Sequence, residues 1–389
     1  MAETLDSMQL ASLRLQNFRN HLHSWFEFGP GTNLLVGDNG QGKTNVIEAI
    51  SYICLTKSFY ASTDMVVLNF DQSVFEVDGT LRSDTGTESR VRVVYDRQVP
   101  RKAYFINNRA VEPFSSVIGK FPVVVCSPEH APVTMGSPHE RRRFIDLVIS
   151  QSSEPYFKTL LEYRHALKQR NKVLLDSKLS GRGETSDLVE PWTQQLIALG
   201  GTLMSWRSRF VVEFLPFIET SYRRLVESEE LPHMKYVPAV TAGDYSSEEG
   251  YREALAAALQ LKAAEERRVG TTLAGPHRDE YAFTINHLDL RGYASQGQHK
   301  TFLIALKLAE FFYLKDRCRE TPVLLLDDVF SELDERRTGR LLEFVGSISQ
   351  TFVTSTGLQA AGRSIDFSGP NKKFQISSGA VLREQAAAS

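Results

Sequence analysis

The sequence predicts an α/β fold in which a mixed sheet with covering helices is interrupted by a mostly helical arm. Three observations lead to this prediction. A short apolar run, Thr32–Val36, enters a glycine-rich turn, after which apolar residues recur at helical spacing. A second apolar run, 322–326, ends in two consecutive aspartates. Between these runs, residues 138–268 carry many charges and few strand signals, so we expect one α/β domain whose two halves flank an insertion.

The composition is that of an ordinary globular protein. Of 389 residues, 42% are apolar and 24% are charged, which is enough chain for two domains or one elaborated domain. The formal net charge is −2, so contact with a polyanion would have to come from local basic clusters. The three cysteines lie far apart among apolar residues, and no CxxC pair predicts a zinc or redox site. Residues 1–10 lack an apolar h-region and no run is long enough to span a membrane, so we expect a cytoplasmic protein without a membrane partner.

The first half of the α/β domain is expected at residues 1–136. Apolar side chains share one face of the helix that follows the glycine-rich turn. Alternating segments between residues 75 and 106 are separated by turn residues and predict antiparallel strands. Residues 121–126 predict a further buried strand.

The helical arm is expected at residues 137–268, and the second half of the α/β domain at 269–389. Apolar residues from Phe157 to Leu174 recur about every 3.5 positions, as in a short coiled-coil-like helix, with a tip loop expected at 177–186. Further elements are expected in this order: helices at 188–225 and 248–268, a strand at 281–285, a helix at 298–317, and strands at 322–326 and 374–381.

The glycine-rich turn has the G-x-x-x-x-G-K-T form of a phosphate-binding loop, and it lies between a strand and a helix, as that loop requires. Its glycines let backbone N–H groups converge on phosphate oxygens at the positive end of the helix. We expect the whole segment to bind ATP: Gly37, Asp38, Asn39, Gly40, Gln41, Gly42, Lys43 and Thr44. Lys43 would reach the β- and γ-phosphates, and the Thr44 hydroxyl would bind Mg²⁺. The spacing is not G-x-G-x-x-G, so a dinucleotide-binding fold is not indicated.

The aspartate pair is the expected counterpart of this loop. Four apolar residues before it predict a buried parallel strand, whose carboxyl end lies in the crevice where ligands bind. Asp327 would hold the Mg²⁺ shell, and Asp328 would orient or deprotonate the attacking water. With Lys43, these carboxylates are the candidate catalytic groups.

A third motif, Ser295-Gln-Gly297-Gln298, opens a helix about 30 residues before the aspartates. It resembles the signature motif of ATP-binding cassettes, although a serine that only caps the helix is the alternative. The resemblance implies that Ser295, Gly297 and Gln298 bind the γ-phosphate of a nucleotide held by a second protomer. ATP would then join a symmetric head-to-head homodimer, and hydrolysis would release it. The form is not G-x-S-x-G, so an esterase nucleophile is not indicated.

The segment after the aspartates has two interpretations. Ser331-Glu-Leu-Asp334 resembles the D-loop of cassettes, which crosses the dimer seam. Ser331 and Asp334 also fit an ordinary helix start, with serine as N-cap and an acid in the first turn. Both interpretations remain open at this point.

Several further segments resemble blocks of the RecF family, in the correct order over most of the chain. They are Leu15-Gln-Asn-Phe18-Arg19-Asn20-His21, Arg141-Arg-Arg-Phe-Ile-Asp146, Leu167-Lys-Gln-Arg-Asn171, Gly275-Pro-His-Arg-Asp279, the signature segment, residues 326–334 and the strand at 374–381. The resemblance implies a cassette-type ATPase head with an inserted arm, in which Arg19 and Asn20 lie near the nucleotide.

The RecF resemblance also implies a function. It implies a weak, DNA-stimulated ATPase that binds single-strand/double-strand junctions or gaps in DNA, with RecR as a partner. With RecR and RecO, such a protein helps to load RecA, and it supports SOS induction and replication restart. A cytoplasmic, nucleoid-associated location follows from that role.

The chain departs from the usual cassette pattern at three places. Asp328 stands where most cassettes carry glutamate, and the RecF family also has aspartate at this position. The shorter side chain of aspartate suits a slow switch better than a pump. No clear glutamine precedes the arm, and Glu129 lies in the comparable region. The switch histidine is missing, because Thr354-Ser-Thr356 follows the last buried run. The group that senses the γ-phosphate is therefore left open.

Local basic clusters are the candidate DNA contacts. The candidates are Arg141, Arg142, Arg143, Arg164 and Lys168, with further arginines and lysines nearby. Phosphate contacts of this kind make binding salt-dependent, with little base readout. The alternative is a set of solvated helix faces, because acids such as Glu162 are interspersed.

Three other functions compete with a RecF-like one. An SMC-like repair ATPase head carries an arm of hundreds of residues, whereas the insertion here is about 130 residues long. The ATPase subunit of a transporter needs a surface for membrane helices and usually carries the glutamate and histidine that are missing here. A non-catalytic scaffold that binds ATP only for assembly conflicts with the intact Lys43, Asp327 and Asp328.

Overall fold

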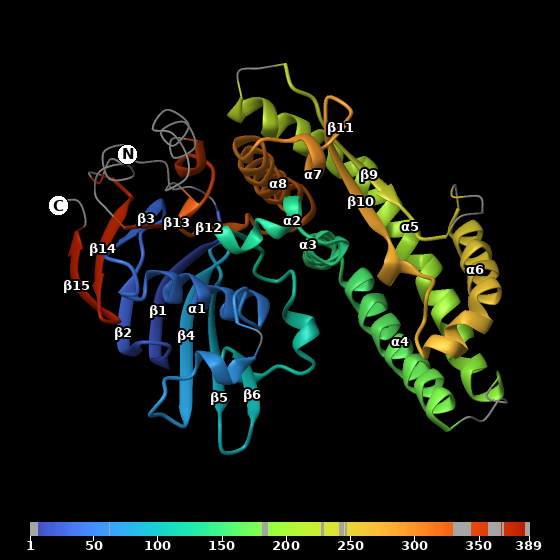
Figure 1. The fold of residues 1–389 in the computed structure, drawn as a ribbon. Coiled ribbons are helices and arrows are strands. Elements are labelled where there is room, and N and C mark those ends of the chain that lie inside the picture. Colours follow the sequence, from blue (N-terminus) through green and yellow to red (C-terminus); the bar gives the residue numbers. More distant parts are fainter. Residues whose placement is uncertain are drawn as a thin grey trace. The chain divides into compact units, whose positions relative to one another are not determined.

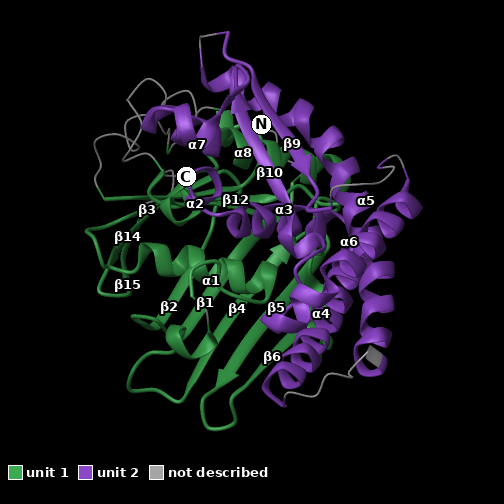
Figure 2. Cartoon of the chain, turned by 45° about the vertical axis from the view of Figure 1, so that its right-hand side comes forward, with its two compact units in different colours: residues 1–131, 304–389 green, residues 132–303 purple. Residues whose placement is uncertain are grey.

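The chain folds into two compact units (Figure 2). In this computed structural model, residues 7–61, 63–180, 186–226, 229–240, 245, 247–329, 344–356, 367 and 369–385 are described. The first unit combines residues 1–131 with 304–389, and the second comprises residues 132–303. The second unit therefore starts earlier and ends later than the arm expected at 137–268. Among the described residues, no helix is long and apolar enough to cross a membrane.

The first unit contains a six-stranded sheet with the order β15-β14-β3-β13-β12-β8, of which every neighbouring pair except β14 and β15 is parallel (Figure 1). Its strands are β3 (Thr32–Val36), β8 (Val123–Cys126), β12 (Val323–Leu326), β13 (Thr351–Ser355), β14 (Lys372–Ser377) and β15 (Ala380–Gln385). Strands β3, β8 and β12 are buried along their whole length, as the continuous apolar runs predict. Because the central strands are parallel, the segments after β3, β12 and β13 meet at one edge of the sheet.

A second sheet of the first unit is antiparallel, with the order β2-β1-β4-β5-β6-β7. Its strands are β1 (Gln9–Phe18), β2 (His21–Glu27), β4 (Val74–Arg82), β5 (Glu88–Asp96), β6 (Arg101–Ile106) and β7 (Arg109–Ala110). The antiparallel strands expected between residues 75 and 106 are confirmed. Helix α1 (Lys43–Leu55) packs on β1, β4 and β5 and buries its apolar face there, so the sheet fixes the helix that begins at the glycine-rich turn.

The prediction of a single C-terminal strand at 374–381 is wrong. The structure has two antiparallel strands, β14 and β15, joined at Ser378 and Gly379. Both turn residues have positive φ, 50° and 73°, which is the backbone of a two-residue hairpin turn. Gly379 N–H donates to the carbonyl of Gln41 at 2.9 Å, so this turn packs against the glycine-rich loop.

The second unit is built mainly from long helices. They are α3 (Pro138–Ser152), α4 (Glu154–Ser180), α5 (Ser186–Leu225) and α6 (Glu248–Val269), with the short α2 (Pro132–Met135) and α7 (Leu290–Tyr293). The helices expected at 188–225 and 248–268 are confirmed to within two residues. The expected tip loop is partly wrong, because α4 continues to Ser180, and residues 181–185 lie outside the described residues.

A small sheet in the second unit contains the strand expected at 281–285, which is confirmed, and two strands that were not expected. It has the order β11-β10-β9, with β9 (Pro232–Val237), β10 (Glu280–Ile285) and β11 (Leu288–Asp289). Strand β9 alternates buried and exposed residues within a segment that the charges made look helical. Its pairing with β10 ties residues 269–303 to the helical unit.

Helix α8 (Gln296–Arg317) carries the signature segment at its start and runs from the second unit into the first. Its residues 301–314 are almost completely buried, and among them Lys307 donates to Glu310 at 2.9 Å. Short 3-10 turns complete the described elements: η1 (Asp64–Val67), η2 (Phe114–Val117), η3 (Pro128–His130) and η4 (Pro276–Arg278).

Candidate nucleotide-binding site

The glycine-rich loop lies between β3 and α1 in the geometry of a phosphate-binding loop. Gly40 and Gly42 have φ of 77° and 109°, which a residue with a Cβ rarely adopts. A Cβ on Gly42 would also lie 2.6 Å from Asn20 Oδ1 and 2.8 Å from His21 Nε2, so only glycine fits. At the start of α1, Val46 N–H donates to the carbonyl of Gly42 at 3.3 Å. The N–H groups of the first turn are therefore available to an anion.

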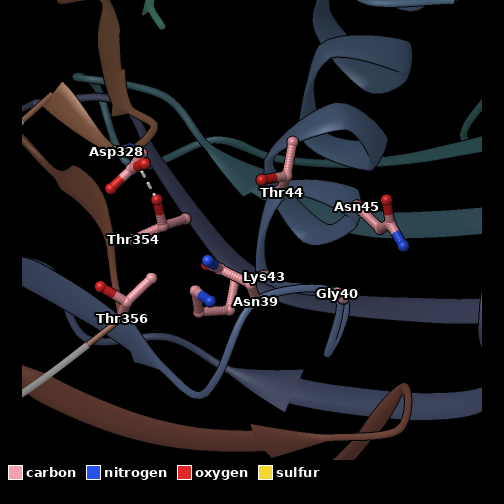
Figure 3. Close-up of a pocket in the computed structure, with 9 residues that line it drawn as sticks. Asn39, Gly40, Lys43, Thr44, Asn45, Asp328, Thr354 and Thr356 are labelled. Carbon is pink, nitrogen blue, oxygen red and sulfur yellow. Dashed lines mark hydrogen bonds between the residues drawn. The ribbon is translucent and has the colours of Figure 1, made fainter. Parts of the chain in front are cut away.

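A pocket of about 140 Å³ lies at this loop (Figure 3). The loop and the first turn of α1 form part of its wall, and Asp328 after β12, Thr354 within β13 and Thr356 after β13 form the rest. The lining residues are Asn39, Gly40, Gly42, Lys43, Thr44, Asn45, Asp328, Thr354 and Thr356. All belong to the first unit, so the pocket is contained in one body.

Lys43 is held inside the loop. Its Nζ donates to the carbonyls of Gly37 at 2.6 Å and Asp38 at 2.8 Å. An ammonium group has three donors, so one remains for a phosphate oxygen. Burial lowers the pKa of Lys43, and the nearby carboxylates of Asp328, Asp327 and Asp38 oppose that shift.

Thr44 and Asp327 meet as the sequence predicts. Thr44 Oγ1 donates to Asp327 Oδ1 at 2.9 Å, and Thr354 Oγ1 donates to the same oxygen at 2.8 Å. Burial raises the pKa of Asp327, while the hydrogen bonds from Thr354 and Thr44 act against that rise. A hydroxyl and a carboxylate side by side are hard oxygen ligands, so the residues present fit Mg²⁺ bound to a nucleotide.

Asp328 has an unusual backbone. Its φ is 51°, in the left-handed region that side chains with a Cβ disfavour. Its N–H donates to Thr354 Oγ1 at 2.8 Å, the bond drawn in Figure 3. Strain of this kind is concentrated at functional sites, which agrees with the place of Asp328 in the pocket wall.

Comparison with known proteins identifies the family. The family model described as the RecF/RecN/SMC N terminal domain matches residues 9–364. The DNA replication and repair protein RecF of Chloroherpeton thalassium is 43% identical over 90% of this chain and 95% of its own. The RecF of Salinibacter ruber is 41% identical over 90% of this chain and 85% of its own. The chain belongs to the RecF family.

Solved structures agree with this assignment. The RecF-ATP structure of the recombination mediator protein in the RecFOR pathway has a TM-score of 0.90 and 30% identity, covering 99% of this chain and 100% of its own. An SMC head bound to a domain of ScpA has a TM-score of 0.55 at 14% identity, with 97% of each chain covered, and shows the fold alone. The expected fold, a cassette-type ATPase head of the RecF and SMC kind, is confirmed.

The RecF block 15–21 packs against the loop. Asn20 Nδ2 donates to the carbonyl of Gly40 at 3.4 Å, and Asn45 donates to Asn20 Oδ1 at 2.7 Å. Arg19 has a different partner, because its guanidinium donates twice to Glu48 of α1, at 2.8 and 2.9 Å. Asn20 therefore lies at the loop, while Arg19 is bound to α1 beside it.

His21 is a part of the site that the sequence did not reveal. It is completely buried, its Nε2 lies 3.0 Å from the carbonyl of Gly42, and its Nδ1 lies 2.9 Å from Ser24 Oγ. Burial lowers its pKa, and the hydrogen bonds to backbone carbonyls oppose this. The only signal was its position next to Asn20, and it supports the loop rather than a metal ion.

The signature segment forms a capping box in the second unit. Ser295 Oγ accepts from Gln298 N–H at 3.2 Å, and Gln298 Oε1 accepts from Ser295 N–H at 2.9 Å. Gln298 Nε2 also donates to Glu230 at 3.0 Å. Ser295 and Gly297 are exposed at the start of α8. The cap is thus present in the structure, and the nucleotide contact of this segment stays a prediction. Ser331 and Asp334 lie outside the described residues.

The prediction that Arg141 contacts DNA is wrong. Its side chain is buried and forms two bonds of 2.8 Å with Glu280 of β10, so it is not available to phosphate. Arg142 is half-buried and donates to the carbonyl of Asp279 at 2.6 Å. The remaining candidates are exposed: Arg143, Lys168, and Arg164, which also pairs with Asp146 at 3.2 Å.

Proposed function

We propose that this protein binds Mg²⁺–ATP at the loop after β3, hydrolyses it slowly, and uses ATP to control its binding to gapped or junction DNA in recombinational repair. The observation that carries the proposal is the contact of Thr44 with Asp327, 2.9 Å apart and 283 residues apart in sequence, beside the available N–H groups of α1. The solved RecF structure described as RecF-ATP supports the same nucleotide here.

In this proposal, different residues of the pocket bind the phosphates, hold the metal and orient the attacking water. The first turn of α1 and the third proton of Lys43 bind phosphate oxygens. Thr44 and Asp327 would hold Mg²⁺, and the metal would supply positive charge that offsets the negative charge of the phosphates. The Asp328 carboxylate accepts a hydrogen bond from the attacking water and orients it. Since aspartate reaches less far than glutamate, slow turnover is expected.

The exposed signature segment supports an ATP-dependent homodimer. In the described part of the chain, Ser295 Oγ acts as an acceptor toward Gln298, so its own proton can be donated to a γ-phosphate. Gly297 has no Cβ to block the approach of that phosphate to the start of α8. We propose that these groups bind the nucleotide of a second copy, and that hydrolysis separates the two copies.

The partners follow from the family. The solved RecF structures are described as a recombination mediator protein of the RecFOR pathway, so we propose RecR as a partner and, with RecO, assistance in loading RecA, SOS induction and replication restart in the cytoplasm. Arg143, Arg164 and Lys168 are the proposed phosphate contacts, because they are the exposed ones among the five candidates named from the sequence.

The test is fluorescence anisotropy of a labelled gapped duplex at a stated salt concentration, with a slowly hydrolysed ATP analogue and with ADP. Tighter binding with the analogue, lost in Ser295→Arg together with the dimer, is the expected result. Equal and weak binding in both nucleotide states would contradict the proposal and favour a scaffold that binds ATP only for assembly.

A further inference from the structure

Strand β13 has a special place in the parallel sheet. It lies between β3, which leads into the phosphate-binding loop, and β12, which leads into the two aspartates. Thr354 pairs with Leu35 of β3, and the preceding Val353 pairs with Leu326 of β12. The side chain of Thr354 therefore emerges level with Asp327, at the edge where the phosphate-binding loop also ends.

The Thr354 hydroxyl is buried and makes one bond to each aspartate. Its proton is donated to Asp327 Oδ1 at 2.8 Å, and its oxygen accepts the N–H of Asp328 at 2.8 Å. A hydroxyl has a single proton, which Asp327 takes, so Thr354 cannot also donate to a γ-phosphate. Thr356 also lines the pocket, but its side chain is exposed, whereas that of Thr354 is buried.

The two hydrogen bonds of Thr354 restrict different groups: one restricts the Asp327 carboxylate and the other restricts the Asp328 backbone. The bond to Asp327 fixes the rotation of a carboxylate whose same oxygen accepts the Thr44 hydroxyl. The bond to Asp328 holds a peptide N–H next to a Cα with φ of 51°, a conformation that persists only when its surroundings enforce it. One side chain thus sets the orientation of both acids, although none of its atoms has to touch the nucleotide.

We propose that Thr354 is a positioning residue for ATP hydrolysis, which holds the Asp327 carboxylate beside Thr44 and the Asp328 backbone in the left-handed conformation that directs its carboxylate to the pocket. The proposal rests on the proposed ATPase function and gives a role to a residue of the segment in which the switch histidine of cassettes is missing. Thr354 acts through the two aspartates rather than as a sensor of the γ-phosphate.

The test compares Thr354→Val, which keeps the shape and removes the hydroxyl, with Thr354→Ser, which keeps the hydroxyl. The matched control is Thr351→Val in the same strand, whose buried hydroxyl bonds the carbonyls of Val345 and Ser349 at the opposite end. The full-length chain is titrated with a fluorescent ATP analogue at increasing Mg²⁺ and in EDTA, and steady-state hydrolysis of ATP is measured.

Thr354→Val is expected to lower kcat by roughly 10- to 100-fold and to raise the Mg²⁺ concentration for half-maximal analogue binding by about 10-fold, as removal of groups that orient metal ligands does. Binding in EDTA is expected to stay unchanged, and Thr354→Ser and Thr351→Val to behave like the unaltered chain. If Thr354→Val does not fold, Thr354→Ala takes its place, because it adds no atom.

Two results would overturn the inference. One is a valine variant with the kcat and Mg²⁺ dependence of the unaltered chain. The other is a serine variant as impaired as the valine variant, since keeping the hydroxyl would then not preserve function, and the site would respond to any change of side chain at this position. If the unaltered chain shows neither hydrolysis nor Mg²⁺-dependent binding, the proposed function itself is wrong, which is distinguishable from both results.

Discussion

The nucleotide pocket and the helical arm are both rich in charged residues. The two regions differ in what those charged side chains bind in the folded protein. In the pocket, Lys43 keeps a proton for a phosphate and Asp328 is held in a strained conformation at the wall. In the arm, Arg207 is buried, with Asp146 at 2.7 Å and Asp279 at 3.2 Å. The comparison teaches that a charge signals a ligand site only where its hydrogen-bonding capacity is not already used by the fold.

The largest expected effect is on stability, from the charge network of the arm. Arg207→Met leaves the buried carboxylate of Asp279 without its ion-pair partner and Asp146 with only the exposed Arg164, and it is expected to cost about 3–5 kcal/mol. The control Arg223→Met removes an exposed arginine that pairs with Glu219 at 3.7 Å, and it should cost less than about 1 kcal/mol. Urea unfolding of each variant measures the difference. Equal losses would show that the buried network is not structural.

A second effect is the pH dependence of arm stability, which arises at His277. Burial lowers the pKa of His277 to about 4, the hydrogen bond to the carbonyl of Thr272 opposes this, and Arg278, Arg142 and Arg207 lower it further. In its neutral form, the ring accepts from Tyr163 OH at 2.7 Å.

The unfolded chain binds a proton near pH 6.5 and the folded chain only near pH 4, so stability is full above pH 6.5 and falls as the pH drops to 4. The loss attributable to His277 is up to about 3 kcal/mol. Urea unfolding at pH 7 and at pH 4.5 should show a smaller loss for His277→Gln than for the unaltered chain, and identical losses would contradict the assignment.

A smaller effect concerns strain in the pocket. Asp328→Gly removes the Cβ from a residue with φ of 51° and is expected to stabilise the fold by about 1 kcal/mol while it abolishes hydrolysis. Asp328→Asn is the matched control, because it also removes the carboxylate but keeps the Cβ. Thermal unfolding compares the two variants. A glycine variant no more stable than the asparagine variant would show that the backbone is not strained.

The smallest effect separates the two kinds of arginine in the basic cluster. Arg143→Glu should weaken binding to gapped DNA and reduce the slope of log affinity against log salt by about 1, as expected for one lost phosphate contact. Arg141→Met should leave that slope unchanged, because Arg141 is bonded to Glu280. The reverse pattern in anisotropy titrations would mean that the buried arginine is released on DNA.

What could be predicted from sequence was local. The loop from Gly37 to Thr44 is contiguous, and its glycines, lysine and threonine each carry their role in their own chemistry. Asp327 could be placed because a buried run ends at it. The role of Thr354 could not be predicted, since it depends on β13 lying between β3 and β12, which the sequence does not state.

Two of the wrong predictions concern residues whose partners are distant in the sequence. Arg141 was taken for a surface residue because its partner Glu280 is 139 residues away. Strand β9 was missed because its alternation is short and stands among charges, and only pairing with β10 makes it a strand. The hairpin at Ser378 and Gly379 was the one error with a local signal, a Ser-Gly pair of the kind that forms two-residue turns.

The most direct test of the central claim is binding of a fluorescent ATP analogue with Mg²⁺, measured for the unaltered chain and for Lys43→Ala. If the pocket after β3 is the nucleotide site, the chain binds the analogue in a Mg²⁺-dependent manner, and Lys43→Ala weakens binding or hydrolysis by roughly 100-fold or more, the scale of losing one charged donor to the transferring phosphate. Equal binding by the two proteins, with no effect of Mg²⁺, would contradict the account.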